Sequence, residues 1–504
     1  MPPLRFHIHT YGCQMNERDS ELAAELLRQQ GCVPAADEHS ADLVIVNTCS
    51  VRAKAEDKAI GKLRLLLVER RRRPKLLVGV IGCMVQRQGA ALLQKLPGLN
   101  FAITPQYLAR LPAVLETIRR GGGPCLEISA RAGAPLDLLQ PAPLLEPAPR
   151  SQPAPRSQPA PRLEPAHRVE PAHRVEQRSS GKISAFINIL YGCDRHCAYC
   201  IVPSVRGPEY SRPPADILAE ARRLLAEGVR EITLLGQSVM RYGMQPSFQP
   251  DTAASPGGFT EPLPRLLEAL AALPDLAPLR PERRLRPERR LRPGCRLRFT
   301  SGHPSGCTPE LARAMAGLPP VCEHLHLPVQ SGADRILRLM RRGYTADDYR
   351  RAVQCLRAAV PGLALTTDII VGFPSETAGE FEATMAFMEE IGFDNAFIFK
   401  YSPRPGTPAA DMPDDVPAAE KLRRNHALIA AQNRRTIAIN QSLVGSTVEA
   451  LAEGPSRRNP ARWAGRTRTN KIVVFDAPPA LAAGDLIPVR VERATPQALY
   501  GRTE

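Results

Sequence analysis

The chain has 504 residues, more than one hydrophobic core usually organises, so we expect several domains. It has no apolar run of membrane-spanning length, and its opening Met-Pro-Pro-Leu-Arg lacks the apolar core of a signal peptide, which excludes a membrane protein and predicts a cytoplasmic one. Twelve cysteines in that compartment indicate metal or redox chemistry rather than disulfides, and a net charge of +16 favours a polyanionic partner.

The first region alternates strands with helices. Strand patterns cover Arg5–Thr10, Asp42–Val46 and Leu76–Ile81, and a helical pattern starts at Asp19 and stops at Gly31. Such alternation predicts a parallel α/β sheet, in which ligands collect at the carboxyl ends of the strands.

Each of these strands is followed closely by a cysteine. The three are Cys13, Cys49 and Cys83. Because parallel strands end at one edge of the sheet, these thiols should converge there. The alternative is that they are ordinary buried thiols, since cysteine is among the most buried residue types.

Two segments of low complexity interrupt the chain. Residues 140–178 contain Ser-Gln-Pro-Ala-Pro-Arg twice and Glu-Pro-Ala-His-Arg-Val twice, which predicts an extended linker stiffened by proline. Leu-Arg-Pro-Glu-Arg-Arg also occurs twice, within a predicted surface insertion at 276–294. Nine Arg and two Glu lie between residues 279 and 298, so this stretch carries much of the net charge and is best explained as a solvated charge run.

The stretch Tyr191–Cys200 places Cys193, Cys197 and Cys200 in a C-x-x-x-C-x-x-C arrangement. A structural zinc site is normally closed by four ligands, whereas a four-iron cluster on three thiolates keeps one iron open to another molecule. The spacing therefore favours an iron–sulfur cluster. A zinc site completed by a distant Cys or His, such as His196, is the alternative.

Strand and helix alternation returns between Ile183 and about Tyr401, with the Cys193 loop following the first strand. The pattern predicts a partial (β/α) barrel, in which chemistry is placed on the loops after the strands. Candidate ligand-binding residues at these strand ends, together with the aromatic residue before the last cysteine, are Tyr199, Gly236, Gln237, Gln330, Ser331 and Asp368.

The last segment changes to short β-rich runs separated by Gly and Pro turns, which predicts a small five-stranded barrel. Arg466, Arg468 and Lys471 cluster near Trp463, the only tryptophan of the chain. These residues could form a phosphate-binding and base-stacking surface, or an ordinary solvated barrel face.

A resemblance extends over nearly the whole chain. The motifs that carry it are Thr10–Asn16, Asn47–Cys49, Gly82-Cys83, Cys193–Gly207, Leu234–Gln237, His326–Gly332, Asp368–Pro374 and Tyr401–Pro408. In this order they resemble the radical S-adenosylmethionine (SAM) methylthiotransferases, and Gly465–Lys471 is similar to the RNA-holding TRAM domain of that family. Departures are Ser238 and Met240, where Asn is usual, and an extra Gly in Ser301–Pro304.

The resemblance implies two four-iron clusters, one on Cys193, Cys197 and Cys200 and an auxiliary one on Cys13, Cys49 and Cys83, with SAM as a cofactor. It also implies tRNA as substrate, an external low-potential electron donor and a monomeric, cytoplasmic enzyme. The expected domains are a methylthiotransferase domain (1–139), the linker (140–178), a radical SAM core (179–434) and a TRAM domain (435–504).

The substrate expectation depends on the residues after Cys49. Ser50 to Lys58, including Arg52, are similar to the branch that methylthiolates isopentenyladenosine in tRNA, and their positive charges suit a phosphate backbone. Methylthiolation of threonylcarbamoyl-adenosine in tRNA, or of an aspartate in a ribosomal protein, is the alternative within the family. A non-enzymatic iron or zinc protein that binds RNA is the alternative outside it.

Overall fold

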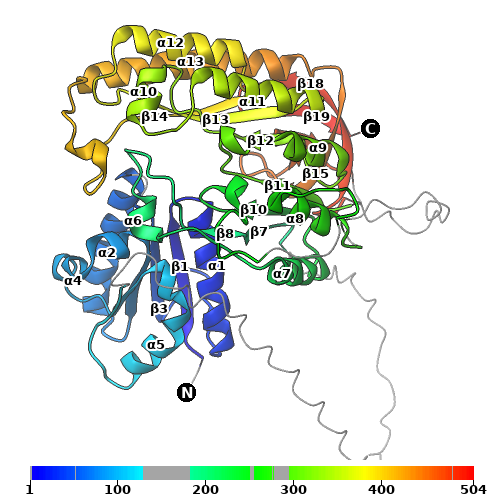
Figure 1. The fold of residues 1–504 in the computed structure, drawn as a ribbon. Helices are drawn as coiled ribbons and strands as arrows, with labels where there is room; N and C mark the ends of the chain where they lie inside the picture. The colour runs from blue at the N-terminus through cyan, green and yellow to red at the C-terminus, as the bar shows by residue number, and fades with distance from the viewer. Residues whose placement is uncertain are drawn as a thin grey trace, which may run out of the picture.

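The computed structural model describes residues 3–50, 53–128, 182–249, 255–274, 276, 294–478 and 481–503. The predicted linker at 140–178, nearly all of the insertion at 276–294, and Arg52 lie outside these ranges. Figure 1 shows three structured regions, the first in blue and cyan, the second in green to orange and the third, at the C-terminus, in orange to red.

The N-terminal region is built on a fully parallel six-stranded sheet in the order β2-β1-β3-β4-β5-β6. The strands are β1 (Arg5–Tyr11), β2 (Val33–Pro34), β3 (Leu43–Thr48), β4 (Leu77–Gly82), β5 (Phe101–Ile103) and β6 (Cys125–Glu127). The helices are α1 (Gln14–Gln29), α2 (Ala53–Arg72), α3 (Cys83–Gln88), α4 (Ala90–Lys95), the 3₁₀ helix η1 (Pro105–Arg110) and α5 (Leu111–Arg119).

Alternate residues of the central strand β3 face two separate hydrophobic cores. Val44 and Val46 pack with α2, α3 and α4, whereas Leu43 and Ile45 pack with α1 and α5. A strand covered on both faces is apolar along its whole length, as in parallel sheets of α/β proteins. The predicted parallel α/β sheet is confirmed.

Helix α1 begins earlier than the periodicity predicts. The pattern starts at Asp19, but the helix starts at Gln14 with Cys13 as its N-cap. The Cys13 backbone N–H donates to Asn16 Oδ1 at 3.4 Å, which closes the first turn. Cysteine is not among the usual capping residues, so sequence rules placed this start too late.

The central region contains two three-stranded parallel sheets, β11-β10-β7 and β12-β13-β14, joined by a parallel bridge between Leu297 and Val321. The strands are β7 (Ser184–Asn188), β10 (Glu231–Leu235), β11 (Arg296–Phe299), β12 (His324–His326), β13 (Ala364–Val371) and β14 (Asn395–Lys400), with the short pair β8 (Leu190–Tyr191) and β9 (Tyr210–Ser211). Together they form the predicted partial barrel.

Helices cover the outer face of this partial barrel, and α12 and α13 lie at the top in Figure 1. They are α7 (Pro214–Ala226), α8 (Pro262–Ala271), α9 (Pro309–Gly317), α10 (Asp334–Leu339), α11 (Ala346–Ala359), α12 (Ala378–Ile391) and α13 (Ala418–Gln441), with 3₁₀ turns η3 (Val239–Arg241), η5 (Pro304–Gly306) and η6 (Pro408–Asp411). The short helix α6 (Val202–Arg206) packs instead against the N-terminal region. No helix in the described part of the chain has the length and apolarity to span a bilayer.

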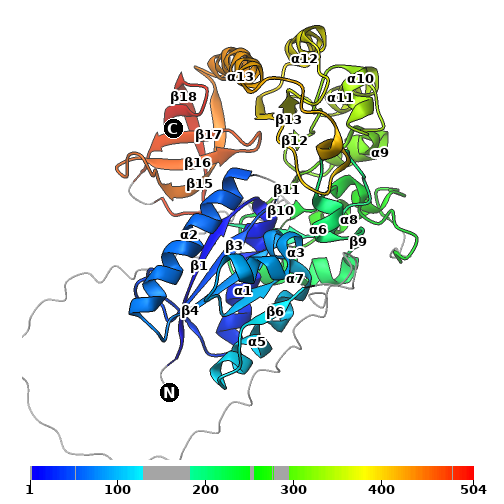
Figure 2. The same ribbon diagram turned by 90° about the vertical axis from the view of Figure 1, so that its left-hand side faces the viewer.

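The C-terminal region is a closed five-stranded barrel in the order β15-β16-β17-β19-β18, as predicted. Its strands are β15 (Thr447–Pro455), β16 (Trp463–Thr467), β17 (Ile472–Asp476), β18 (Leu486–Ala494) and β19 (Leu499–Thr503). Figure 2 shows this barrel beside β10 to β13 of the central region and above α2 of the N-terminal region.

Candidate functional site

Six cysteines from two regions of the chain line one cavity of about 320 Å³. Cys13, Cys49 and Cys83 follow β1, β3 and β4, and Cys193, Cys197 and Cys200 follow β8. Strands of the N-terminal sheet and of the partial barrel end at this cavity. The ends of strands are where open α/β sheets and (β/α) barrels place ligands. The structure thus brings the two predicted cysteine sets face to face.

A buried network of amide hydrogen bonds joins the residues that follow β1 to the end of β3 in the N-terminal sheet. Asn16 Nδ2 donates to Asn47 Oδ1 at 3.0 Å and to the Thr48 carbonyl at 3.1 Å, and Asn47 Nδ2 donates to the Asn16 carbonyl at 2.7 Å. Because these side chains are fully buried, each unpaired amide would be costly, so the network fixes the start of α1 against the end of β3. Cys13 and Cys49 are held together as a result.

The end of β4 also lies close to the end of β3. Gly82 has a φ of +105°, and a Cβ there would collide with the Thr48 carbonyl oxygen. Glycine therefore allows β4 to deliver Cys83 beside Cys49.

Hydrogen bonding to Cys49, and next the charge of Arg206, lower the pKa of the Cys13 thiol to about 6. At Cys83, burial is the largest influence, and it raises the pKa of that thiol. Cys13 is therefore the readier of the two to become a thiolate.

The Cys193–Cys200 loop is fixed by backbone and side-chain contacts. Ala198 N–H donates to the Met340 carbonyl at 3.0 Å, and the guanidinium of buried Arg342 donates to Cys197 Sγ at 3.2 Å. Burial raises the pKa of Cys193 to about 11 and that of Cys200 to about 12. These thiols keep their protons until a metal displaces them.

Four of the predicted ligand-binding residues line the cavity, namely Gly236, Gln237, Gln330 and Asp368. The Gln237 Oε1 atom is buried and has no hydrogen-bond partner among the described residues. Because leaving a buried acceptor unpaired costs about 1–3 kcal/mol, this cavity-lining residue is a candidate to accept a hydrogen bond from a ligand. The Asp368 carboxylate, which comes from within β13, lies 3.5 Å from His326 Nε2.

The other two predicted ligand-binding residues do not line the cavity. The Ser331 hydroxyl accepts from the Ala333 N–H at 3.2 Å and contacts Thr384 Oγ1 at 3.2 Å, so it supports the start of α10. Tyr199 packs in the small core behind the loop, and its hydroxyl accepts from Arg342 at 3.4 Å.

Two of the predicted RNA-binding residues are used inside the protein. Arg468 Nε donates to Glu323 at 2.8 Å, and Lys471 Nζ donates to Asp394 at 2.8 Å, both across the contact with the central region. Arg466 pairs with Glu453 of the barrel at 2.9 Å, and Trp463 is half-buried against the barrel core. Arg468 and Lys471 therefore dock the barrel rather than offer free charges.

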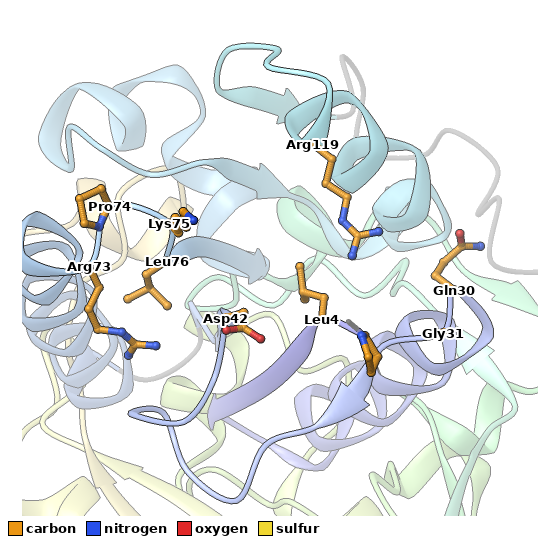
Figure 3. Close-up of a pocket in the computed structure, with 10 residues that line it drawn as sticks. Leu4, Gln30, Gly31, Asp42, Arg73, Pro74, Lys75, Leu76 and Arg119 are labelled. Atoms are coloured by element: carbon orange, nitrogen blue, oxygen red, sulfur yellow. The ribbon is translucent and has the colours of Figure 1, made fainter. Parts of the chain in front are cut away.

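A larger cavity, of about 1010 Å³, lies far from the cysteines. It is bordered by Leu4, Asp42 and Leu76, each of which precedes a strand, so it lies at the opposite edge of the sheet. Figure 3 shows Asp42 and Leu4 between Arg73 on one side and Arg119 on the other. It contains none of the six thiols, so the chemistry belongs to the smaller cavity.

Three family profiles match the chain. They are the uncharacterized protein family UPF0004 at residues 5–104, the radical SAM superfamily at 187–388 and the TRAM domain at 441–503. A tRNA-2-methylthio-N(6)-dimethylallyladenosine synthase of Akkermansia muciniphila is 40% identical over 99% of this chain and 98% of its own length. The synthase of the same name from Moorella thermoacetica is 40% identical over 98% of this chain and 97% of its own length.

The chain belongs to this family of radical SAM enzymes. Among solved structures, the radical SAM methyltransferase TsrM from Kitasatospora setae aligns with a TM-score of 0.50 and 17% identity, covering 81% of this chain and 77% of that one. That likeness supports the fold alone. The radical SAM domain implies SAM and a four-iron cluster as cofactors.

The residues present fit such a cluster. Thiolates are the ligands that four-iron clusters take, and three of them leave one iron open. Among the described residues no three Cys, His, Asp or Glu side chains converge on one point as ligands of a single metal ion do. Cluster thiolates bind separate irons and need no such convergence. Arg342 also fits, since its guanidinium donates to Tyr344, Tyr199, the Pro328 carbonyl and Cys197, none of them a carboxylate.

Arg206 and Arg342 are candidate site residues that were not predicted from the sequence. Each places a buried guanidinium 3.2 Å from a cysteine sulfur, Arg206 at Cys83 and Arg342 at Cys197. Arg206 does occur within the Cys193–Gly207 motif, but its partner is 123 residues away in sequence. In a chain with 67 Lys and Arg residues, no local signal separates these two from solvated arginines.

Proposed function

We propose that this chain methylthiolates carbon 2 of isopentenyladenosine next to the anticodon in tRNA. SAM serves both as methyl donor and as radical source, and the sulfur is supplied through an auxiliary four-iron cluster on Cys13, Cys49 and Cys83. The observation that carries the proposal is the pair of three-cysteine sets that face one cavity. A radical site alone needs only one such set.

Each group of side chains has a distinct task. Cys193, Cys197 and Cys200 hold the radical SAM cluster, and Arg342 provides a cation beside it. The unpaired Gln237 Oε1 is an acceptor for the ligand, and Gly236, Gln330 and Asp368 complete the wall. When bound, the cluster supplies the electron that cleaves SAM and so gives a radical able to break a carbon–hydrogen bond beyond the reach of acid/base chemistry.

Further parts of the proposal concern partners. An external low-potential donor is needed, because no residue of the chain can supply that electron. We propose a monomer that acts in the cytoplasm, where its tRNA substrate is modified. The TRAM match supports RNA as the partner, with Trp463 and Arg466 as candidate contacts and with Arg52, three residues after Cys49 in the sequence, as a further one.

The test offers the anaerobically reconstituted and reduced enzyme two forms of one tRNA, with and without the isopentenyl group. Nucleoside mass analysis should detect the methylthio product only on the isopentenylated form. Equal reaction of both forms, preference for threonylcarbamoyl-adenosine, or modification of a ribosomal protein alone would contradict the substrate assignment. A Cys197→Ala variant should give neither methylthio product nor 5′-deoxyadenosine.

A further inference from the structure

Arg206 belongs to one domain and touches the cysteine set of another. It ends α6, which follows the Cys193–Cys200 loop of the radical SAM domain. Its Nε–H donates to Cys83 Sγ at 3.2 Å, and its Nη2–H donates to Asp19 Oδ2 at 2.7 Å. The side chains of Arg206 and Asp19 are 5% and 4% exposed, so this contact is closed to water.

The backbone around Arg206 holds the side chain in this position. Val205 and Ile201 pack directly on Cys83, and Gln106 Nε2 donates to the Val205 carbonyl at 2.9 Å. The α6 helix is therefore docked on the N-terminal domain by apolar and polar contacts together. The guanidinium cannot leave without separating the two domains at this point.

A buried cation next to a cluster ligand has a predictable electrical effect. Reduction adds one negative charge to a cluster, and a nearby positive charge in a medium of low dielectric stabilises that charge. The reduction potential of a four-iron cluster is set in part by such charges and hydrogen bonds to its sulfurs. Asp19, of opposite charge and at the same contact, must have the opposite effect.

Arg342 provides a matched comparison inside the same molecule. It is also buried and also lies 3.2 Å from a cysteine sulfur, but that sulfur is Cys197 of the radical SAM set. Arg206 and Arg342 thus each donate a hydrogen bond to one sulfur of a cysteine set, and Arg206 comes from a different domain than its cysteine.

We propose that Arg206 is a positioning residue that completes the auxiliary cluster site from the neighbouring domain and raises the reduction potential of that cluster. This inference rests on the proposed second cluster. It means that the auxiliary site reaches its working potential only while the two domains are docked.

The experiment isolates the auxiliary cluster. The full-length chain carrying Cys193→Ala, Cys197→Ala and Cys200→Ala is reconstituted anaerobically, and its remaining cluster is titrated with a reductant while its electron paramagnetic resonance signal is followed. Arg206→Gln should shift the midpoint to a more negative potential, and Arg206→Lys should shift it less. Asp19→Asn should shift it to a more positive potential, and Arg342→Gln should shift it less than Arg206→Gln does, because Arg342 contacts a cysteine of the other set.

The outcomes separate two failures. If the parent protein of this series binds no iron, the second cluster is refuted and the role of Arg206 with it. If the cluster forms but its potential is the same in Arg206→Gln, or moves as much in Arg342→Gln, the role of Arg206 alone is refuted. If Arg206→Gln fails to fold, Arg206→Lys and Asp19→Asn still test the role of Arg206. A purely structural role does not predict that these two variants shift the midpoint potential in opposite directions.

Discussion

Gly192 precedes the first cysteine of the radical SAM set in a left-handed conformation, with a φ of +71°. The Cys193 N–H donates to the Gly207 carbonyl at 3.0 Å, so the chain runs close to residues 207 and 208 here. A Cβ on residue 192 would collide with the carbonyl oxygens of Gly207 and Pro208. The backbone at this position admits glycine alone.

Gly192→Ala should therefore displace Cys193. Because misplacement by about 1 Å can cost about 100-fold in rate, SAM cleavage should fall by that order, measured as 5′-deoxyadenosine released. The control is Gly379→Ala in α12, where an added Cβ meets nothing within 4 Å. Normal cleavage by Gly192→Ala would show that the loop is not held as described.

His324 makes the stability of the molecule depend on pH. Burial, and next the charge of Arg298, lower the pKa of this histidine from 6.5 to about 3. His326, Lys471 and Arg466 also face it and lower its pKa further. The folded protein thus keeps His324 neutral, while the unfolded chain takes up a proton below about pH 6.5.

The sign follows from this difference in bound protons. The contribution of His324 is fully present above pH 6.5 and is lost as pH falls toward 3, with a slope of up to about 1.4 kcal/mol per pH unit. His324→Gln should flatten the fall in the free energy of unfolding between pH 6.5 and 5, measured by urea denaturation. An unchanged slope in this variant would contradict the assignment.

The β16–β17 turn is one of the elements that join the TRAM barrel to the radical SAM domain. Arg298 of β11 donates to the Thr467 carbonyl at 2.7 Å and to the Arg468 carbonyl at 2.6 Å. In the other direction, Arg468 forms an ion pair with Glu323, and Lys471 forms one with Asp394. The turn therefore serves docking.

Arg468→Ala combined with Lys471→Ala should loosen this contact. Faster hydrogen exchange is expected in β16 and β17 and in the facing strand β12, because two partly buried ion pairs are lost. The salt dependence of tRNA affinity should change little, since these charges are already paired.

The reciprocal control uses the exposed Arg457 and Arg458 between β15 and β16. Their replacement by Ala should leave hydrogen exchange unchanged. If they contact phosphates, the slope of log affinity against log salt should fall by roughly 0.7 to 0.9 per lost contact. Identical behaviour of the two double variants would contradict the division of roles.

Elements were predictable where a local pattern determines them. The predicted alternation of strands and helices between Ile183 and about Tyr401 is observed in the partial barrel, because burial of one or both faces of a strand dictates its pattern. The convergence of Cys13, Cys49 and Cys83 was predictable because each follows a parallel strand, and the grouping of Cys193, Cys197 and Cys200 was predictable from their spacing. The start of α1 at an unusual Cys13 cap was not.

The charged contacts could not be predicted. Arg468 and Glu323 are 145 residues apart, and Lys471 and Asp394 are 77 apart. In the sequence these basic residues cannot be told apart from an RNA-binding cluster. Only the three-dimensional arrangement separates charges that hold the protein together from charges that face outward.

At the scale of the whole molecule, the two cysteine sets can be tested separately. Replacing Cys13, Cys49 and Cys83 by Ala should remove about half of the bound iron, because two four-iron clusters would contribute equally. SAM cleavage should persist while the methylthio product disappears. Iron content equal to that of the parent enzyme would refute the auxiliary cluster.

The carbonyl contacts that Arg296 and Arg298 make with the TRAM barrel have a further consequence. Arg296 donates to the Arg466 carbonyl at 2.6 Å, next to the two contacts of Arg298, so strand β11 of the radical SAM domain holds the barrel by its backbone. We therefore expect the barrel to stay at a constant distance from the cavity. An RNA bound to the barrel should then present to the cavity only the nucleotide at the matching distance along its fold. A tRNA lengthened by one base pair in the anticodon stem should therefore bind with similar affinity but bring the wrong base to the cavity.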